Sequence, residues 1–496
     1  MSLRKLDAAL RKCNFSPSGF AAELDEAWQD WARGLESPTQ RAVSGWLQLG
    51  ELNALRVAIA LFVTGHRVSK GQVEEFLPEA TCLCDGQQRL RARWRLSPLQ
   101  ISIDGKEHTW FVPSDPRSVP GVPLPADHVL GLGGATNSLL AWTPREHFGT
   151  VLDLGCGSGA QALAATAHAD SVTGVDILPR ALGAAGVAAQ LAGESVELLQ
   201  SDMFSAVRGR RFDLIVSNPP FVITPQQVRE GERFTYRDGG RDGDDLVAEL
   251  VAALPEYLSE GGVAALICNW QITGQWRERW DSWLSHSPLD AWVCLREVAS
   301  PAAYAKMWLR DEGLIPGTAE YAARERLWLD DFDRRGITGV GFGYVLLHRG
   351  QGVPVRRFED ALGTDRAPGS EFASHLLTAF ARERGGGLED TALKEARLVV
   401  PHDVTEERFY TPGAQDPQVI MLHQGGGVGR QIRVDTALAG LAGACDGELA
   451  IGQIIGALSV LLDADKGELE RELLPRVRDL YWQGFLRETA DSPVRF

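Results

Sequence analysis

The sequence predicts an α/β protein in which a mostly parallel sheet lies between a mostly helical region and an α+β region. Between about residues 126 and 350, strand-like apolar runs alternate with helical ones, beginning TVLDLG, QALAATAHA, SVTGVD, RALGAAGVAAQLA. This alternation is typical of βαβ units on a parallel sheet. The chain has 496 residues, more than a single hydrophobic core usually organises. We therefore expect three domains, at residues 1–115, 126–350 and 365–496.

The composition is that of a globular protein rather than a disordered one. Hydrophobic residues make up 44% of the chain, with 14 Trp and 18 Phe. A net charge of −16 excludes the broad basic surface of general nucleic-acid binders. The 7 cysteines are odd in number and include no CxxC pair, so we expect no metal site and reduced thiols. No apolar leader or membrane-spanning stretch is evident, and we expect a cytoplasmic protein without a membrane partner.

The N-terminal region is expected to be helical to about residue 80 and then to form short strands. In RLRARWRL, Arg89, Arg91, Arg93 and Arg95 alternate with apolar residues, which predicts one half-buried strand, and LQISIDG is a possible partner. The arginine face is either a solvated strand surface or a grip for phosphates or an acidic protein. The proline-rich segment at 114–125 predicts a linker, and the recognition of the substrate is expected to fall to the region before it.

Two further regions follow the first βαβ units. The strands predicted at AWVCLREV and VGFGYVLLHRG are about 40 residues apart, so the segment between them is expected to be a helical insertion. After residue 365 the order is helical, then three strands, then two helices, which suggests a winged-helix-like end. GGGVGR at 425–430 lacks the Lys-Ser/Thr of a phosphate-binding loop and predicts a hairpin turn. The acidic helices there favour protein contact or simple packing over nucleic-acid binding.

The first motif with chemistry is the turn in VLDLGCGSGAQALA. A strand ends at Leu154, a helix begins after the turn, and three glycines lie between them: Gly155, Gly157 and Gly159. Glycines let a ligand approach the backbone, and the start of the helix offers free N–H groups to a carboxylate. Dinucleotide-binding folds use a related turn, so this motif alone does not identify the ligand. Cys156 has no base near it in the sequence, and packing is the expected role.

Acidic residues end the next two predicted strands. Asp176 ends SVTGVD, where a carboxylate can accept hydrogen bonds from both ribose hydroxyls of a nucleoside. Asp202 follows the next strand in LLQSDMF, where it can accept from an adenine amino group while Met203 packs on the ring. Both positions lie at the carboxyl edge of the sheet, where ligands of open α/β folds bind.

The fourth strand ends in FDLIVSNPPF. The Asn218 side-chain oxygen and the Pro219 carbonyl could accept two hydrogen bonds from a target NH2 group, and Phe221 could stack on the planar group bonded to it. Amide and exocyclic amino nitrogens have delocalised lone pairs, so acceptors that favour positive charge on them assist attack. The alternative is that Asn218 is a turn residue and Phe221 a core aromatic.

Together, DLGCGSG, Asp176, SDMF and NPPF resemble class I S-adenosylmethionine-dependent methyltransferases, in the branch whose (N/D)PP(Y/F) motif modifies nitrogen. The resemblance covers residues 126–350 and implies a Rossmann-like sheet of seven strands with S-adenosylmethionine as the cofactor. It also implies catalytic roles for Asn218, Pro219 and Phe221. The residues expected to bind the cofactor are Asp153, Gly155, Gly157, Gly159, Asp176, Ile177, Asp202, Met203 and Asn218.

Within that branch the chain is similar to the HemK/PrmC-type glutamine methyltransferases and to the rRNA guanine-N2 methyltransferases, which share a comparable RDGGRDG run. The acceptor is therefore expected to be a protein glutamine or, alternatively, an exocyclic amino group of guanine or adenine in RNA or DNA. The net charge favours protein, whereas a basic face near the motif would favour nucleic acid: Arg208, Arg210, Arg211, Arg229, Arg233 and Arg237. A small-molecule tailoring enzyme and a non-catalytic S-adenosylmethionine-binding protein remain further alternatives.

Overall fold

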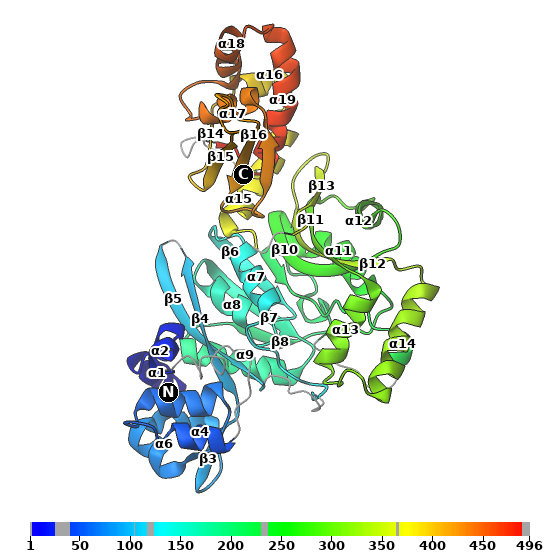
Figure 1. Ribbon diagram of the computed structural model, residues 1–496. Helices are drawn as coiled ribbons and strands as arrows, with labels where there is room; N and C mark the ends of the chain where they lie inside the picture. Colours follow the sequence, from blue (N-terminus) through cyan, green and yellow to red (C-terminus); the bar gives the residue numbers. More distant parts are fainter. Residues whose placement is uncertain are drawn as a thin grey trace.

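A computed structural model describes residues 2–24, 40–103, 105–116, 124–229, 237–363 and 367–488, and its largest element is a mixed sheet (Figure 1). In the described part of the chain this sheet has 8 strands in the order β13-β11-β12-β10-β9-β6-β7-β8. The strands are β6 (Phe148–Leu154), β7 (Ala169–Asp176), β8 (Glu197–Gln200), β9 (Phe212–Ser217), β10 (Leu258–Ile272), β11 (Asp290–Ala299), β12 (Gly339–His348) and β13 (Arg356–Asp360).

The sheet confirms the predicted α/β class. Strands β6 to β10 run parallel, and β12 lies antiparallel between β10 and β11. The strand count exceeds the expected seven by one, because β13 adds to the edge parallel to β11. The sequence of β13, RRFED, has no run of apolar residues, which is why it was not predicted as a strand.

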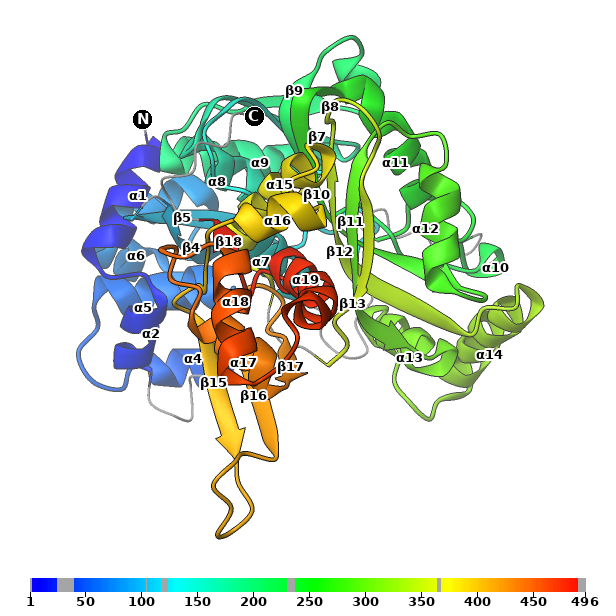
Figure 2. The same cartoon turned by 90° about the horizontal axis from the view of Figure 1, so that it is seen from above.

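Helices cover both faces of the sheet, and this explains the nearly continuous apolar runs of its strands. Figure 2 shows α11 and α12 on one side of the strands and α7, α8 and α9 on the other. Along β6, Val151 contributes to one buried cluster and Leu152 to another. The helices of this region are α7 (Gly134–Trp142), α8 (Ala160–Thr166), α9 (Pro179–Ala192), η3 (Ser205–Val207), α10 (Gln226–Arg229), α11 (Asp245–Tyr257) and α12 (Trp276–Leu284).

The helical insertion predicted before β12 is confirmed. Helices α13 (Pro301–Asp311) and α14 (Ala319–Arg334) connect β11 to β12 and pack against each other. Their buried aromatic residues form a separate cluster with the segment that follows β9, including Val222 and Ile223. The insertion therefore supports the loop in which the NPPF motif lies.

The N-terminal region is helical with two small sheets. Its helices are α1 (Ser2–Lys12), α2 (Pro17–Glu23), α4 (Gln40–Trp46), α5 (Ala54–Ala58), η1 (Ile59–Val63), α6 (Lys70–Phe76) and η2 (Pro78–Leu83). One sheet pairs β3 (Arg89–Ala92) with β1 (Val68–Ser69) and β2 (Cys84–Asp85). The other is the hairpin of β4 (Arg95–Ile103) and β5 (Lys106–Ser114), which packs on α9.

The prediction of a single strand over RLRARWRL is wrong, because the segment is divided between two strands, β3 and β4. The chain leaves β3 after Ala92, the Arg93 N–H donates to the Leu83 carbonyl at 2.8 Å, and β4 begins at Arg95. The expected partner, LQISIDG, is the continuation of β4 and pairs with β5. Strict alternation over eight residues does not reveal a bend that a tertiary contact imposes.

The C-terminal region begins with helices, as expected, and its strands follow. Its elements are α15 (Ser370–Arg384), α16 (Asp390–Glu395), β14 (Leu398–Val399), β15 (Val404–Phe409), β16 (Val419–Gln424), β17 (Gln431–Val434), α17 (Thr436–Gly443), α18 (Ile451–Leu461), α19 (Lys466–Trp482) and β18 (Arg487–Glu488). The hairpin at GGGVGR is confirmed, because β16 and β17 pair antiparallel across it. One buried cluster contains Trp292 of the main sheet and Phe372 of α15, so the two regions share a core. The domain boundaries remain a prediction, and the predicted linker lies partly outside the described residues, at 117–123.

Among the described residues, no helix is long and apolar enough to cross a membrane.

Candidate active site

The glycine turn after β6 has a backbone that side chains would strain. Gly155, Gly157 and Gly159 have φ values of 75, 52 and 82°, in the left-handed region that favours glycine. A Cβ added to Gly155 or Gly157 would meet no atom within 4 Å, so the space in front of the turn is open. A Cβ on Gly159 would lie 3.0 Å from the Ala185 Cβ of α9. The first two glycines line a cavity, whereas Gly159 allows α8 to pack closely on α9.

Two carboxylates hold this turn in place. The Asp176 carboxylate accepts hydrogen bonds from the Gly157 and Leu178 N–H groups, each at 2.9 Å. The Asp153 carboxylate accepts from the Ala162 N–H at 2.9 Å, at the start of α8. Burial raises the pKa of both carboxyl groups, that of Asp153 to about 7. Both residues line the cavity in front of the glycines.

The far wall of the cavity comes from the ends of β7 and β8. Ile177, Asp202 and Met203 all line it. Met203 has a φ of 49°, and its carbonyl accepts a hydrogen bond from the Ser201 hydroxyl at 2.7 Å. This bond fixes a backbone conformation that non-glycine residues rarely adopt.

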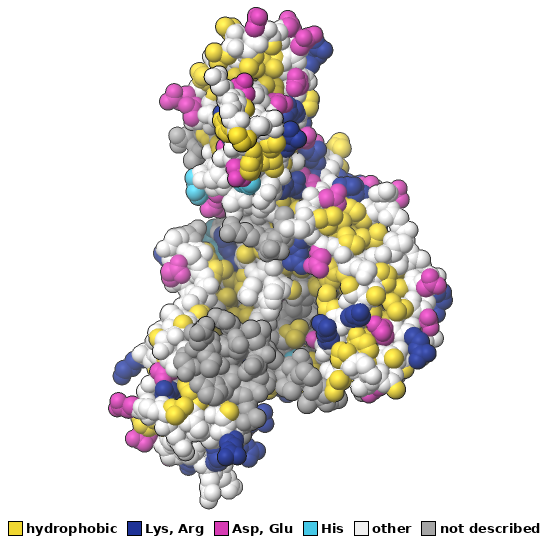
Figure 3. Space-filling model, in the orientation of Figure 1, with side chains coloured by type: hydrophobic (Ala, Val, Ile, Leu, Met, Phe, Trp, Pro, Cys, Tyr) yellow, Lys and Arg dark blue, Asp and Glu magenta, His cyan; other side chains and the backbone are white. Residues whose placement is uncertain are grey.

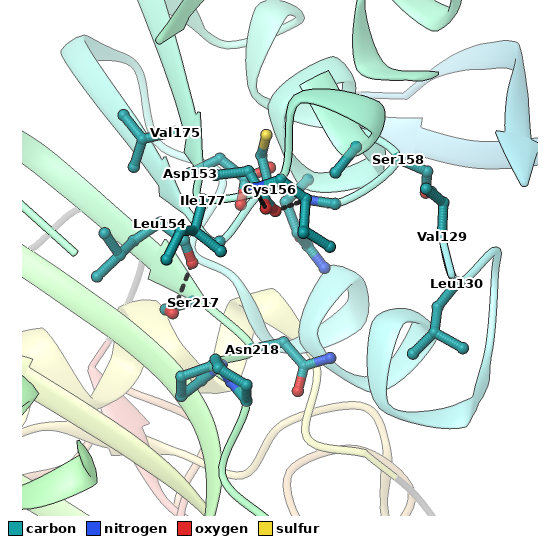
Figure 4. Close-up of a pocket in the computed structure, with 18 of the residues that line it drawn as sticks. Val129, Leu130, Asp153, Leu154, Cys156, Ser158, Val175, Ile177, Ser217 and Asn218 are labelled. Atoms are coloured by element: carbon teal, nitrogen blue, oxygen red, sulfur yellow. Dashed lines mark hydrogen bonds between the residues drawn. The ribbon is translucent and has the colours of Figure 1, made fainter. Parts of the chain in front are cut away.

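The NPPF motif brings Asn218 and Pro219 to the same cavity. The Ser217 hydroxyl donates to the Leu154 carbonyl at 2.7 Å and so joins the ends of β9 and β6 (Figure 4). Figure 4 shows the Asn218 amide pointing into the space between the glycine turn and the segment of Val129 and Leu130. The Asn218 Oδ1 is buried and has no hydrogen-bond partner among the described residues. A buried acceptor without a partner is costly, which indicates a site prepared for a ligand donor.

Phe221 is not brought into the cavity. It is half-buried, packs against the core beneath α11, and its backbone forms an isolated bridge with Asp238. Its stacking role remains a prediction, because the structure does not place the ring beside Asn218.

The loop after Asn218 is held by a second segment that the sequence patterns do not identify. The Val222 N–H donates to the Arg237 carbonyl at 2.9 Å, and the Gly239 N–H donates to the Pro220 carbonyl at 3.1 Å. The Arg237 guanidinium, whose side chain is 3% exposed, contacts the Glu312 carboxylate at 2.6 Å and the Asp311 carboxylate at 3.1 Å. These contacts tie the NPPF loop to the end of α13.

Tyr304 of the insertion provides another support. Its buried hydroxyl accepts hydrogen bonds from the Ile223 N–H at 3.0 Å and from the Asn269 Nδ2 at 2.7 Å. Burial raises the pKa of this phenol well above its ordinary value. The hydroxyl therefore stays protonated and joins the NPPF loop to β10.

The entrance to the cavity comes from a segment without a sequence motif. His128, Val129, Leu130 and Gly131 line the cavity, as does Gln161 of α8. Burial lowers the pKa of the His128 imidazole, which favours its neutral form. Asp238 and Gly239 also line the cavity, and the only sequence indication of them was the resemblance of the RDGGRDG run.

Three of the six arginines expected to form a basic face near the motif, Arg210, Arg229 and Arg237, have acidic partners. Arg210 pairs with Glu197 at 2.8 Å, Arg211 donates to the Leu258 carbonyl at 2.7 Å, and Arg229 pairs with Asp242. Arg237 is buried in the ion pairs described above, and Arg208 is exposed. Arg233 lies outside the described residues. Spacing in the sequence cannot show which arginines already have acidic partners.

The cavity fits S-adenosylmethionine by the chemistry of its walls. Open space before two glycines allows a ligand to lie against the backbone, and Asp176 offers acceptors where a ribose would lie. The apolar side chains of Ile177 and Met203 can cover a planar base. The unpartnered Asn218 Oδ1 provides an acceptor at the other end of the cavity.

Comparisons with known proteins identify methyltransferases among the relatives of this chain. A family model described as a methyltransferase small domain matches residues 131–275, and a model of a domain of unknown function matches residues 378–488. The release factor glutamine methyltransferase of Geobacter sulfurreducens is 33% identical over 257 residues, which are 48% of this chain and 84% of the relative. The ribosomal protein uL3 glutamine methyltransferase of Xanthomonas campestris pv. campestris is 39% identical over 137 residues, 26% of this chain and 44% of the relative.

Among solved structures, the T. thermophilus 16S rRNA N2 G1207 methyltransferase, in complex with AdoMet and guanosine, is 22% identical with a TM-score of 0.26. That match covers 44% of this chain and 62% of the other. The chain spans 84% of the Geobacter relative but less than half of the Xanthomonas one. Both relatives are named as glutamine methyltransferases, but the substrates in their names are not assigned to this chain on that ground. The chain belongs to the class I S-adenosylmethionine-dependent N-methyltransferases, in the family of the Geobacter enzyme.

Proposed function

We propose that this enzyme methylates the side-chain amide nitrogen of a glutamine in a protein. The observation that supports this most directly is the buried, unpartnered Asn218 Oδ1 at the wall of the cofactor cavity. A primary amide has two N–H groups to donate and a planar shape, which suits an acceptor in the wall of the cofactor cavity. The names of the relatives support the same acceptor, since they describe glutamine methyltransferases of a release factor and of a ribosomal protein.

In this proposal the cofactor lies along the glycine turn. Asp176 accepts from the ribose hydroxyls, Asp202 from the adenine amino group, and Ile177 and Met203 cover the base. Asp153 acts indirectly: its bond to the Ala162 N–H positions the start of α8 and with it the turn of Gly155 and Gly157. Gly159 contributes through helix packing rather than contact.

The acceptor amide is held by two oxygens. The Asn218 Oδ1 and the Pro219 carbonyl accept its two N–H groups, which fixes the nitrogen and draws positive charge onto it. The bound cofactor supplies an electrophilic methyl group. The rigid dipeptide Pro219–Pro220 limits the movement of both acceptors, because proline fixes φ. The stacking of Phe221 on the planar group stays an expectation from the motif, because its ring packs against the core and does not line the cavity.

A protein acceptor is preferred over a nucleobase for a reason visible in the site. Three of the arginines that were expected to face a nucleic acid near the motif, Arg210, Arg229 and Arg237, are paired with carboxylates. The net charge of −16 acts in the same direction. We keep the cytoplasm as the proposed compartment, where release factors and ribosomal proteins are found.

The test is methyl transfer from radiolabelled S-adenosylmethionine into an extract of the organism that encodes the enzyme. Wild type is compared with Asn218→Ala and with Asn53→Ser, a matched control in which a remote asparagine that caps α5 is replaced by another capping residue. Label that is sensitive to protease, absent with Asn218→Ala, and located on glutamine by mass spectrometry is the expected result. Label sensitive to nuclease would move the acceptor to a nucleobase. No label dependent on Asn218 in either fraction would refute a macromolecular acceptor.

A further inference from the structure

Two adjoining grooves connect the cofactor cavity with the N-terminal region. The cavity shares His128, Leu130 and Gly131 with a groove that runs along β4. That groove shares Arg95 and Asp115 with a second groove beside β3. A bound chain could therefore extend from the reacting nitrogen to the N-terminal region without leaving the surface of the enzyme.

The groove beside β3, here called the arginine groove, is strongly basic. Its lining includes two carboxylates, Asp85 and Asp115, and six arginines: Arg67, Arg89, Arg91, Arg93, Arg95 and Arg180. In the rest of the chain acidic residues dominate, since the net charge is −16. Figure 3 shows Lys and Arg side chains gathered at the end of the N-terminal region where β3 lies in Figure 1.

Three of the exposed arginines of this groove, Arg89, Arg91 and Arg93, are oriented by carbonyl groups. Arg89 donates to the Arg67 carbonyl at 2.9 Å, Arg91 to the Gly65 carbonyl at 3.2 Å, and Arg93 to the Cys82 carbonyl at 2.6 Å. A carbonyl fixes a guanidinium but leaves its charge uncompensated. Among the described residues, the groove's two carboxylates take part in ion pairs, Asp85 with Arg93 at 3.8 Å and Asp115 with Arg180, and no carboxylate pairs with Arg89 or Arg91. The groove therefore presents oriented positive charge to a partner.

The groove along β4 indicates which class of partner binds to the arginine groove. Its walls include Phe20, Leu96, Leu99, Leu130 and Leu140, which suit the side chains of a polypeptide. The carboxylates of Asp85 and Asp115 lie among the arginines and would repel closely spaced phosphates. A polypeptide with separated acidic side chains avoids that repulsion.

We propose that the arginine groove binds an acidic segment of the protein that is methylated, while the stretch between that segment and the acceptor lies in the groove along β4. This inference rests on the proposed function, since it assumes a protein acceptor. The acidic segment is then the feature, in addition to the glutamine, by which the enzyme selects its substrate.

The test measures binding without methyl transfer. A fluorescein-labelled ten-residue peptide in which glutamate alternates with glycine is titrated with the full-length enzyme and followed by fluorescence anisotropy, beside a ten-nucleotide single-stranded RNA. The variants are Arg89→Gln/Arg91→Gln/Arg93→Gln and the corresponding triple lysine variant. The control, Arg208→Gln/Arg326→Gln/Arg471→Gln, removes the same charge from exposed positions elsewhere.

The glutamine variant is expected to weaken peptide binding about tenfold, the sum of three exposed ion pairs, and salt should weaken the wild type similarly. The lysine variant should recover most of the affinity and the control should match wild type. Equal loss in the control, or no loss in the glutamine variant, would overturn the proposal, as would tighter binding of the RNA through the same arginines. Because no methyl transfer is needed, failure here leaves the glutamine assignment standing. Intact peptide binding without label on glutamine would instead refute the proposed function.

Discussion

Replacing Arg237 should both destabilise the protein and impair its chemistry. Arg237 lies in the segment that pairs with the NPPF loop, and its guanidinium contacts Glu312 at 2.6 Å. The side chains are 3% and 6% exposed, so the pair is buried. In Arg237→Met, Glu312 would keep its burial and lose its nearest cation, and its pKa, already raised by that burial, would rise further.

Breaking a buried ion pair by removing one partner costs about 3–5 kcal/mol. At about 2–4 °C per kcal/mol for a domain of this size, the melting temperature should fall by roughly 10 °C. The double variant Arg237→Met/Glu312→Gln should recover part of this loss, because no buried charge is then left unpaired. Since a displacement of about 1 Å at a reacting group can cost about 100-fold, kcat should fall by up to that factor.

Thermal unfolding and methyl transfer into extract protein check both expectations, with Arg326→Met on the same insertion as an exposed control. If Arg237→Met does not fold, Arg237→Lys keeps the charge and should show a smaller loss of both stability and kcat. Wild-type melting temperature together with a wild-type rate in Arg237→Met would refute the idea that this ion pair holds the NPPF loop. A loss of stability with an unchanged kcat would limit its role to folding.

Three further changes probe other parts of the site. Burial raises the pKa of Asp153 from 3.8 to about 7, so the folded protein holds this proton when the unfolded chain has lost it. The free energy of unfolding should therefore fall by up to about 4 kcal/mol as the pH rises from 4 to 7, and urea titrations should show a flatter dependence in Asp153→Asn. Asp176→Ala removes a buried acceptor of two backbone N–H groups and should weaken S-adenosylmethionine binding about 10-fold to 100-fold by calorimetry; an unchanged affinity would exclude it from the cofactor site. Tyr304→Phe leaves the Ile223 N–H and the Asn269 amide without their acceptor. The free energy of unfolding measured in urea should fall by about 2 kcal/mol. An unchanged free energy of unfolding would show that these donors find another partner.

The sequence predicted the parts of this enzyme whose signals are local. The glycine turn was predicted because glycines let a ligand approach the backbone, and Asp176 and Asp202 were predicted from their place at strand ends. In the structure Gly155, Gly157 and both aspartates line one cavity. Asn218 was identified because an asparagine before two prolines is unusual after a buried strand.

The parts that were missed depend on contacts between distant segments. Arg237 and Glu312 are 75 residues apart, and no periodicity connects them. His128 follows a proline-rich stretch, lines the cavity, and contacts Asp115, which follows β5 and pairs with Arg180 of α9. The bend at Arg93 has the same origin, since a carbonyl of η2 interrupts an otherwise regular alternation.

The position of β12 in the sheet has a consequence for synthesis of the chain. β12 pairs on one side with β10 and on the other with β11, although it follows both in sequence. Until residue 348 has left the ribosome, these two earlier strands have no neighbour between them and expose apolar edges. The insertion that supports the NPPF loop is completed in the same interval. A nascent chain that already contains every motif residue is therefore still without an ordered catalytic loop, and its exposed strand edges need protection from aggregation during translation.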